Sequence, residues 1–235
     1  MIKAIFFDLD NTLCNCIEAD DKTFKLVETL ALENEPGINT ESLKNSFFKI
    51  LGQIPFDPEG IIPVTKWREK IWQQALMAQN IEKLTLAKKL NQFFLEKRLE
   101  FYKFDPGVED FLNKIKCEYK IVLITNGDSD IQRPKIDACK AELIFGKNIL
   151  VGGEEEKEKP HKSIFYKACS LVSCSPNEAI HVGDSLTKDI QGGINSGLAA
   201  TVWIENSYQS KDDIHIRSDF TIKSVLLLTE ILKQY

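Results

Sequence analysis

Long apolar segments are missing from this sequence. No run among its 235 residues approaches the roughly 20 apolar residues that a membrane-spanning helix needs. The stretch that precedes Asp8 is apolar but short, and it lacks the length and the cleavage pattern of a secretory signal. We therefore expect a soluble, cytoplasmic protein that does not work at a membrane.

Cysteine pairs and a strong charge of one sign are missing as well. None of the six cysteines belongs to a C-x-x-C motif, so the sequence indicates no disulfide framework. The net charge is only −5, which gives the chain no long-range attraction to nucleic acid or to an anionic membrane. An anionic ligand such as a phosphate would have to be attracted by a few local cations.

The sequence does contain an alternation of strand-like and helical patterns. With 43% hydrophobic residues, the chain can bury a sizeable core in one large domain or two small ones. Short continuous apolar runs, typical of strands buried on both faces, occur at 4–7, 121–124, 149–151, 179–182 and 200–204. Helical patterns separate them, and the clearest follows Asp105-Pro106, a pair suited to a helix start. The alternation predicts an α/β fold with a parallel sheet covered by helices on both faces.

Residues 17–100 form a different region, with almost no strand-like runs. Helices are predicted near 18–34, 40–51, 65–79 and 82–103, and a connector rich in proline and glycine at 52–60 divides the region in two. A segment of this length is too long to be a loop. We therefore predict an all-helical domain, 17–100, inserted into an α/β core made of 1–16 and 101–235.

Polar side chains gather at the predicted carboxyl ends of the strands, where an open parallel sheet binds its ligands. They occur in four segments: Asp8, Asp10 and Thr12; Thr125 and Asn126; Lys159; and Asp184 with Asp189. Each segment alone is more often a turn or a helix cap than a site. Together they place several carboxylates at one sheet edge, where they would repel one another unless a cation lay among them. A hard divalent cation, most simply Mg²⁺, suits such oxygen ligands.

This set of side chains suits the hydrolysis of phosphate esters. Asp8 would attack phosphorus and form an aspartyl-phosphate, because Mg²⁺ and Lys159 reduce the repulsion between the two anions. Asp10 could protonate the leaving alcohol and then deprotonate the attacking water. The phosphoryl oxygens would be bound by the Lys159 ammonium, the Thr125 hydroxyl, the Asn126 amide, and the backbone N–H groups of Leu9 and Asp10.

The four segments resemble the four motifs of the haloacid dehalogenase-like hydrolase superfamily, in the same order and across the whole predicted core. The resemblance implies a Rossmann-like core and identifies the helical insert as a C1-type cap. It also implies that Asp8, the backbone carbonyl of Asp10, and Asp184 hold Mg²⁺. Asp189 would be a further ligand or a partner that orients the ligands, and Thr12 would support the Asp10 side chain.

Stretches that include many residues besides those of the motifs resemble one family of that superfamily, the N-acylneuraminate-9-phosphatases. The similar stretches are 123–128, 132–139, 151–154, 158–160, 163–166, 183–193 and 200–204. The resemblance implies a phosphomonoesterase for a small phosphorylated metabolite such as N-acylneuraminate 9-phosphate. The presence of Asp10 favours phosphoryl transfer over carbon–halogen cleavage. We expect the protein to be a monomer or a weak dimer.

Other functions on the same scaffold stay open. The insert, which selects the leaving group in this superfamily, is less similar than the core, so phosphoglycolate or a nucleoside monophosphate could be the substrate. A sugar phosphomutase would use the same aspartyl-phosphate and pass the phosphoryl group to a sugar. A binding protein without activity would have lost a nucleophile or a metal ligand, and here all the expected positions are filled.

A few further residues have a functional and a structural interpretation. Arg68, Lys66 and Arg133 could contact a substrate carboxylate, but ordinary surface charge is the preferred interpretation. His181 lies inside a predicted strand and is interpreted as a core residue rather than as an acid or base.

Overall fold

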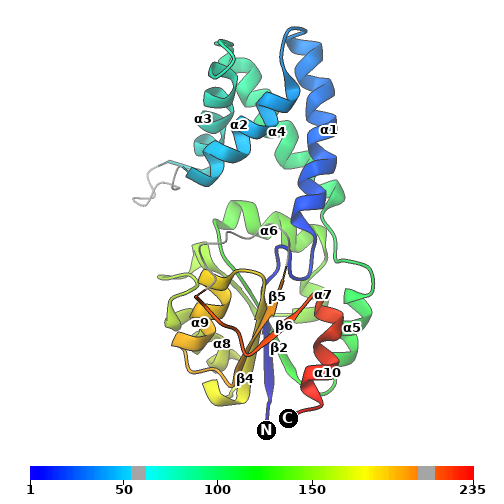
Figure 1. Ribbon diagram of the computed structural model, residues 1–235, viewed down its shortest axis with the longest axis vertical. Coiled ribbons are helices and arrows are strands. Elements are labelled where there is room, and N and C mark those ends of the chain that lie inside the picture. Colours follow the sequence, from blue (N-terminus) through cyan, green and yellow to red (C-terminus); the bar gives the residue numbers. More distant parts are fainter. Residues whose placement is uncertain (54–61, 206–214) are drawn as a thin grey trace. The chain divides into compact units, whose positions relative to one another are not determined.

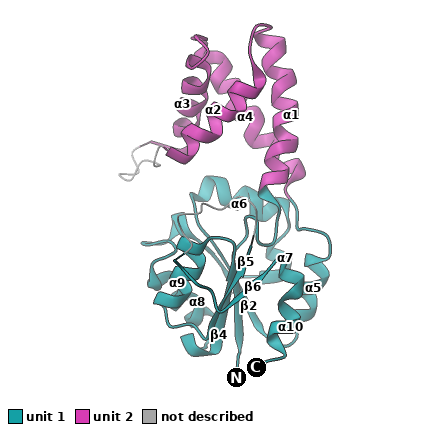
Figure 2. Ribbon diagram, in the orientation of Figure 1, with its two compact units in different colours: residues 1–16, 103–235 teal, residues 17–102 magenta. Residues whose placement is uncertain are grey.

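The computed structural model describes residues 1–53, 62–205 and 215–235, and the chain divides into two compact units (Figure 2). One unit consists of Met1–Cys16 and Lys103–Tyr235, and the other of Ile17–Tyr102. The sequence predicts an insert at 17–100, whereas the helical unit continues to Tyr102, because its last helix ends only at Phe101. The function of this unit as a cap stays a prediction.

A six-stranded sheet forms the centre of the first unit. Its strands are β1 (Ala4–Phe7), β2 (Lys120–Thr125), β3 (Ile149–Val151), β4 (Ala179–Gly183), β5 (Ala200–Ile204) and β6 (Phe220–Ile222). All neighbouring strands are parallel, in the order β3-β2-β1-β4-β5-β6. The predicted α/β fold with a parallel sheet is confirmed. The sequence does not predict β6, because this short edge strand is partly exposed and lacks a continuous apolar run.

Helices and short helical turns connect these strands. The helices are α5 (Val108–Ile115), α6 (Ser129–Ala138), α7 (Glu142–Phe145), α8 (Lys162–Leu171), α9 (Gln191–Asn195) and α10 (Leu228–Leu232), and the turns are η1 (Gly152–Glu154), η2 (Pro176–Glu178), η3 (Leu186–Ile190) and η5 (Val225–Leu227). Helix α5 begins later than the predicted start at Asp105-Pro106, because Gly107 precedes it with a φ of 83°. The Asp105 carboxylate instead accepts a hydrogen bond from the Asn15 N–H (2.9 Å).

Successive phenylalanines of β1 anchor helices on the two faces of the sheet. Side chains alternate between the faces of a strand, so Phe6 and Phe7 point in opposite directions. Phe6 packs in a buried cluster with Phe165 of α8. Phe7 makes edge contacts with Phe111 of α5 and Phe145 of α7, with ring centroids 6.5 and 6.3 Å apart. Helices therefore cover both faces, as Figure 1 shows.

The second unit consists of helices packed around aromatic side chains. Its helices are α1 (Cys16–Asn34), α2 (Thr40–Gln53), α3 (Val64–Met77) and α4 (Leu84–Phe101). Phe47 of α2 stacks on Trp72 of α3 with ring centroids 4.1 Å apart, and Phe24 and Phe94 pack against both rings. The predicted connector at 52–60 begins inside α2 and otherwise lies outside the described residues. In the described parts of the chain, no helix combines the length and the apolar character that crossing a membrane requires.

Candidate active site

The carboxyl ends of β1, β2 and β4 meet at the centre of the sheet. β1 pairs with β2 on one side and with β4 on the other, so that Phe7 lies opposite both Leu123 and Val182. Such a switch point is where open parallel sheets bind their ligands. A cavity of about 230 Å³ lies here. Its lining includes all the predicted site residues except Leu9 and Thr12, together with Asn11, Ser185 and Lys188.

Asp8 leaves β1 and enters a tight turn. Asn11 takes a left-handed φ of 58° in this turn, a conformation that asparagine tolerates better than most residues. The turn brings the hydroxyl of Thr12 back to Asp8, and the hydroxyl donates a hydrogen bond to Asp8 Oδ2 (3.1 Å). In this structure the turn directs the Thr12 hydroxyl to the Asp8 carboxylate, and support of the Asp10 side chain by Thr12 stays a prediction.

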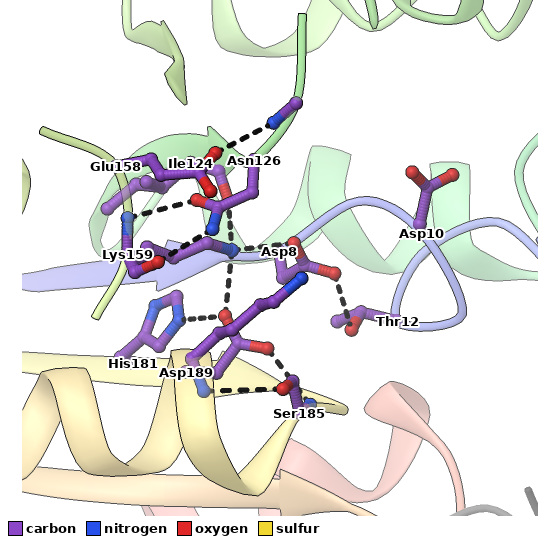
Figure 3. A network of polar contacts seen from close by, with 12 residues as sticks. Asp8, Asp10, Thr12, Ile124, Asn126, Glu158, Lys159, His181, Ser185 and Asp189 are labelled. Atoms are coloured by element: carbon purple, nitrogen blue, oxygen red, sulfur yellow. Dashed lines mark hydrogen bonds and ion pairs between the residues drawn. The ribbon is translucent and has the colours of Figure 1, made fainter. Parts of the chain in front are cut away.

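The ammonium of Lys159 lies at the centre of the site (Figure 3). It donates to Asp8 Oδ1 (2.6 Å) and to the Ile124 carbonyl (2.7 Å), and it forms an ion pair with Asp189 Oδ1 (2.7 Å). A lysine ammonium has three N–H donors, so these contacts account for all of them. The Lys159 side chain is only 1% exposed. A charge buried to this degree needs a counter-charge inside the protein, and Asp189 and Asp8 both lie in contact with it.

Asn126 fixes the loop that carries Lys159 to the end of β2. Its amide donates to the Lys159 carbonyl (2.7 Å) and accepts a hydrogen bond from the Lys159 N–H (3.0 Å). The Asn126 amide, predicted as a phosphate ligand, is thus engaged in positioning the lysine. Phosphate binding by Asn126, by Thr125 and by the N–H groups of Leu9 and Asp10 stays a prediction.

Both carboxylate oxygens of Asp189 are engaged by the protein. Oδ1 contacts Lys159 and His181 Nε2 (2.9 Å), and Oδ2 accepts a hydrogen bond from the Ser185 N–H (3.0 Å). This packing requires glycine at 183, where a Cβ would lie 2.3 Å from Asp189 Cγ. Burial lowers the pKa of His181, which favours the neutral ring as the donor to Asp189. His181 is buried as predicted, but the prediction missed its contact with this carboxylate.

Burial and charge give the two aspartates opposite properties. Burial raises the pKa of Asp8 to about 6, against the opposing effect of Lys159, and the charge of Asp189 adds to the rise. Burial also acts to raise the pKa of Asp189, but Lys159 and His181 outweigh it and hold that pKa well below its ordinary value. The two aspartates hold the pKa of Lys159 above its ordinary value against the effect of burial. Lys159 and Asp189 are a permanent ion pair, whereas the charge on Asp8 needs further support.

Three carboxylates lie close enough together to hold a metal ion. Ligand oxygens of Asp8, Asp184 and Asp189 all lie within 4.8 Å of one another. These groups carry more negative charge than Lys159 can offset, and oxygen donors suit a hard cation. Trp203 fixes the loop at this point, because its Nε1 donates to the Asp184 carbonyl (2.8 Å). The carboxylates of Asp8 and Asp184 therefore fit the predicted Mg²⁺, and the Asp10 carbonyl as a third ligand stays a prediction.

The Asp10 carboxylate points away from the Lys159 network in Figure 3 and is held by helix α6. Lys135 Nζ contacts Asp10 Oδ1 (2.9 Å) and Oδ2 (2.7 Å), and Gln132 Nε2 donates to Oδ2 (3.0 Å). The sequence does not predict either helix residue as part of the site. Their three-residue spacing indicates a shared helix face, but nothing local in the sequence indicates that this face meets Asp10.

Two of the basic residues considered for a substrate carboxylate are already in ion pairs. Lys66 pairs with Glu69 (2.9 Å) and Arg133 with Glu154 (2.5 Å). Arg68 is half-buried on α3. These ion pairs favour the structural interpretation for Lys66 and Arg133.

Known proteins resemble this chain over almost its whole length. Residues 2–197 match the family model of the haloacid dehalogenase-like hydrolases. The chain is 32% identical to N-acylneuraminate-9-phosphatase of Rattus norvegicus, over 99% of this chain and 94% of the relative. It is 26% identical to glyceraldehyde 3-phosphate phosphatase of Pyrococcus furiosus, with the same coverage of 99% and 94%. The solved structure of the HAD-hydrolase YfnB from Bacillus subtilis, bound to magnesium, shares the fold, with a TM-score of 0.78 and 22% identity over 99% of both chains.

Asp8→Asn should stabilise the metal-free fold at neutral pH and have little effect in acid. The pKa of Asp8 is raised from 3.8 to about 6, so the folded protein holds this proton more tightly than the unfolded chain. The wild-type free energy of unfolding should therefore fall, relative to that of the variant, as the pH rises from about 4 to about 6. A shift of this size corresponds to roughly 3 kcal/mol at neutral pH. Urea unfolding with a chelator present, across this pH range, measures the difference.

Asp110→Asn is the matched control, because Asp110 is exposed on α5. Its effect on the free energy of unfolding should stay within about 0.5 kcal/mol. A loss of stability in Asp8→Asn at neutral pH, or a gain that does not change with pH, would contradict the unfavourable charge assigned to Asp8.

Proposed function

This chain belongs to the haloacid dehalogenase-like hydrolase family and is a phosphoric monoester hydrolase, and we propose that it works through an aspartyl-phosphate on Asp8. The observation that carries the proposal is the environment of Asp8. Its carboxylate follows the central strand, lines the cavity, and has one oxygen against Lys159 and the other against Thr12. A buried carboxylate fixed in this way is ionised at neutral pH and oriented for attack.

In the first step, an oxygen of Asp8 forms a bond to phosphorus, and the bond from phosphorus to the alcohol oxygen breaks. Asp10 transfers its proton to that oxygen, so the alcohol leaves in neutral form. The products of this step are the free alcohol and a phosphoryl group on Asp8.

In the second step, a water molecule attacks phosphorus and Asp10, now ionised, accepts its proton. The bond between phosphorus and the Asp8 oxygen breaks, which restores the carboxylate of Asp8 and the protonated form of Asp10. One ester and one water are consumed, and one alcohol and one inorganic phosphate are released.

Positive charge must offset the repulsion between Asp8 and the phosphate group. Lys159 brings one charge to within 2.6 Å of Asp8, and it acts mainly through this charge because its N–H donors all have protein acceptors. The groups that would hold Mg²⁺ are Asp8, Asp184 and the backbone carbonyl of Asp10, while Asp189 keeps Lys159 in place. When bound, Mg²⁺ supplies Lewis-acid stabilisation of the phosphoryl oxygens.

The proposed substrate is N-acylneuraminate 9-phosphate. The support is the similarity to the rat phosphatase named for this compound, which extends over 99% of the chain and thus includes the helical unit. That unit would serve as a C1-type cap that selects the leaving group. A cytoplasmic location and a monomeric or weakly dimeric state are proposed along with this substrate.

Loss of the Asp8 nucleophile should abolish phosphatase activity on any ester. Asp8→Asn is expected to lower kcat for 4-nitrophenyl phosphate by more than about a thousand-fold, because no covalent intermediate can form. Circular dichroism should show an intact fold, and Asp110→Asn should keep wild-type turnover. Substantial activity in the Asp8 variant would show that another group attacks phosphorus.

The choice of substrate is tested by a release assay for inorganic phosphate across candidate esters. We expect kcat/KM for N-acylneuraminate 9-phosphate to exceed that for phosphoglycolate, glyceraldehyde 3-phosphate and nucleoside monophosphates by at least about ten-fold. Similar low values for all of them would overturn the substrate assignment and leave the chemistry intact. Formation of a sugar phosphate isomer without phosphate release would indicate a mutase instead.

A further inference from the structure

Helix α6 presents two buried polar side chains to Asp10. Lys135 Nζ lies 2.9 and 2.7 Å from the two Asp10 oxygens, and Gln132 Nε2 lies 3.0 Å from Oδ2. Lys135 is 4% exposed and Gln132 is 5% exposed. Three donor contacts to one carboxylate specify both its position and its rotation, whereas a single contact would leave rotation free.

The burial of Lys135 indicates that this contact is strong. Removing an ammonium group from water is strongly unfavourable unless a partner of opposite charge compensates for the lost hydration. The Lys135 side chain is 5% exposed, and that of Asp10 is 24% exposed. The lysine is therefore the fixed, enclosed partner of the pair, and the aspartate is the partner that can reach the cavity.

Gln132 connects Asp10 to the rest of the site. The same Nε2 that donates to Asp10 also donates to the backbone carbonyl of Asn126 (2.5 Å). The side-chain amide of Asn126 in turn contacts both the backbone N–H and the backbone carbonyl of Lys159. A chain of hydrogen bonds therefore runs from the Asp10 carboxylate to the loop of Lys159.

Local packing fixes the side chain of Gln132 in this position. Gly127, with a φ of 109°, lies directly against it, and a Cβ at this glycine would be 3.3 Å from Gln132 Nε2. Asp128 caps the start of α6, because its side chain accepts a hydrogen bond from the Asp130 N–H (2.9 Å). Helix α6 thus begins close to the carboxyl end of β2, and this fixed start sets the orientation of the helix face that carries Gln132 and Lys135.

We propose that Gln132 and Lys135 are positioning residues that set the place of the Asp10 carboxylate for proton transfer. The inference rests on the proposed role of Asp10 as acid and base. Proton transfer requires the donor oxygen within hydrogen-bond reach of the leaving oxygen, so a protonated carboxyl group that is free to rotate transfers its proton less often. Loss of either residue should therefore resemble a partial loss of Asp10.

A pair of aryl phosphates separates this role from a general structural one. 4-Nitrophenolate can leave without a proton, whereas the leaving oxygen of phenyl phosphate is more basic and needs one. The value of kcat/KM reports the step in which the leaving group departs. In Asp10→Asn, kcat/KM should fall about a hundred-fold more for phenyl phosphate than for 4-nitrophenyl phosphate. In Lys135→Met, kcat/KM should fall about ten-fold or more further for phenyl phosphate than for 4-nitrophenyl phosphate. Lys135→Arg should recover part of this loss of kcat/KM, because arginine keeps two donors for the carboxylate.

The double variant gives the sharpest result. If Lys135 acts through Asp10, adding Lys135→Met to Asp10→Asn should lower kcat/KM by less than about two-fold. Lys167→Met is the matched control, because Lys167 also contacts both oxygens of a carboxylate, that of Glu155 (2.7 and 2.8 Å), but does so at the surface. Lys167→Met should leave kcat/KM unchanged for both esters.

Two results would overturn the inference. One is a fall in kcat/KM in Lys135→Met that is equal for both esters. The other is a fall in kcat/KM in the double variant of Asp10→Asn and Lys135→Met that equals the product of the fold-losses of the two single variants. If Lys135→Met does not fold, Gln132→Met serves the same comparison, since it removes a neutral donor only. If Asp10→Asn itself shows no preference between the esters, the proposed role of Asp10 has failed, and that result is distinct from a failure confined to Lys135.

Discussion

A buried ammonium group, that of Lys159, is the constraint on which the site depends. With its side chain 1% exposed, it must find all its hydrogen-bond acceptors and its counter-charges inside the protein. It finds them at the ends of two strands and in η3, as Asp8, the Ile124 carbonyl and Asp189. The parallel pairing of β1 with β2 and β4 brings these groups together. The Lys159 ammonium can therefore lie between the carboxylates of Asp8 and Asp189 only because the strands are in this order.

The two aspartates beside Lys159 differ because their other partners differ. Asp189 also contacts His181 and the Ser185 N–H, and the charge of Lys159 together with the contact to His181 holds its pKa well below the ordinary value. Asp8 has the hydroxyl of Thr12 as its further donor, and burial raises its pKa to about 6. One carboxylate is therefore stabilised as a permanent anion, and the other remains energetically costly when ionised. This difference accounts for the assignment of Asp8 as the nucleophile and Asp189 as its support.

The sequence predicted those parts of the molecule that depend on local pattern. Continuous apolar runs located the five buried strands, and most of the polar residues that follow them line one cavity, the candidate site, whereas β6 was missed because it is a partly exposed edge strand. The contact of Thr12 with Asp8 was not predicted, because it depends on a turn geometry, with Asn11 in the left-handed region, that spacing does not specify. Gln132 and Lys135 were missed for a different reason. Their spacing gives a helix face, but the docking of α6 decides what that face touches.

The central claim is that the phosphoryl group passes through Asp8. A single turnover with an aryl phosphate, quenched in acid and followed by borohydride reduction, converts an acyl phosphate into the corresponding alcohol, which peptide mass spectrometry can locate. The account predicts that this modification occurs at Asp8 and is absent from Asp8→Asn. Release of the phenol without any modified aspartate, or a modification at Asp10, Asp184 or Asp189 instead, would contradict it.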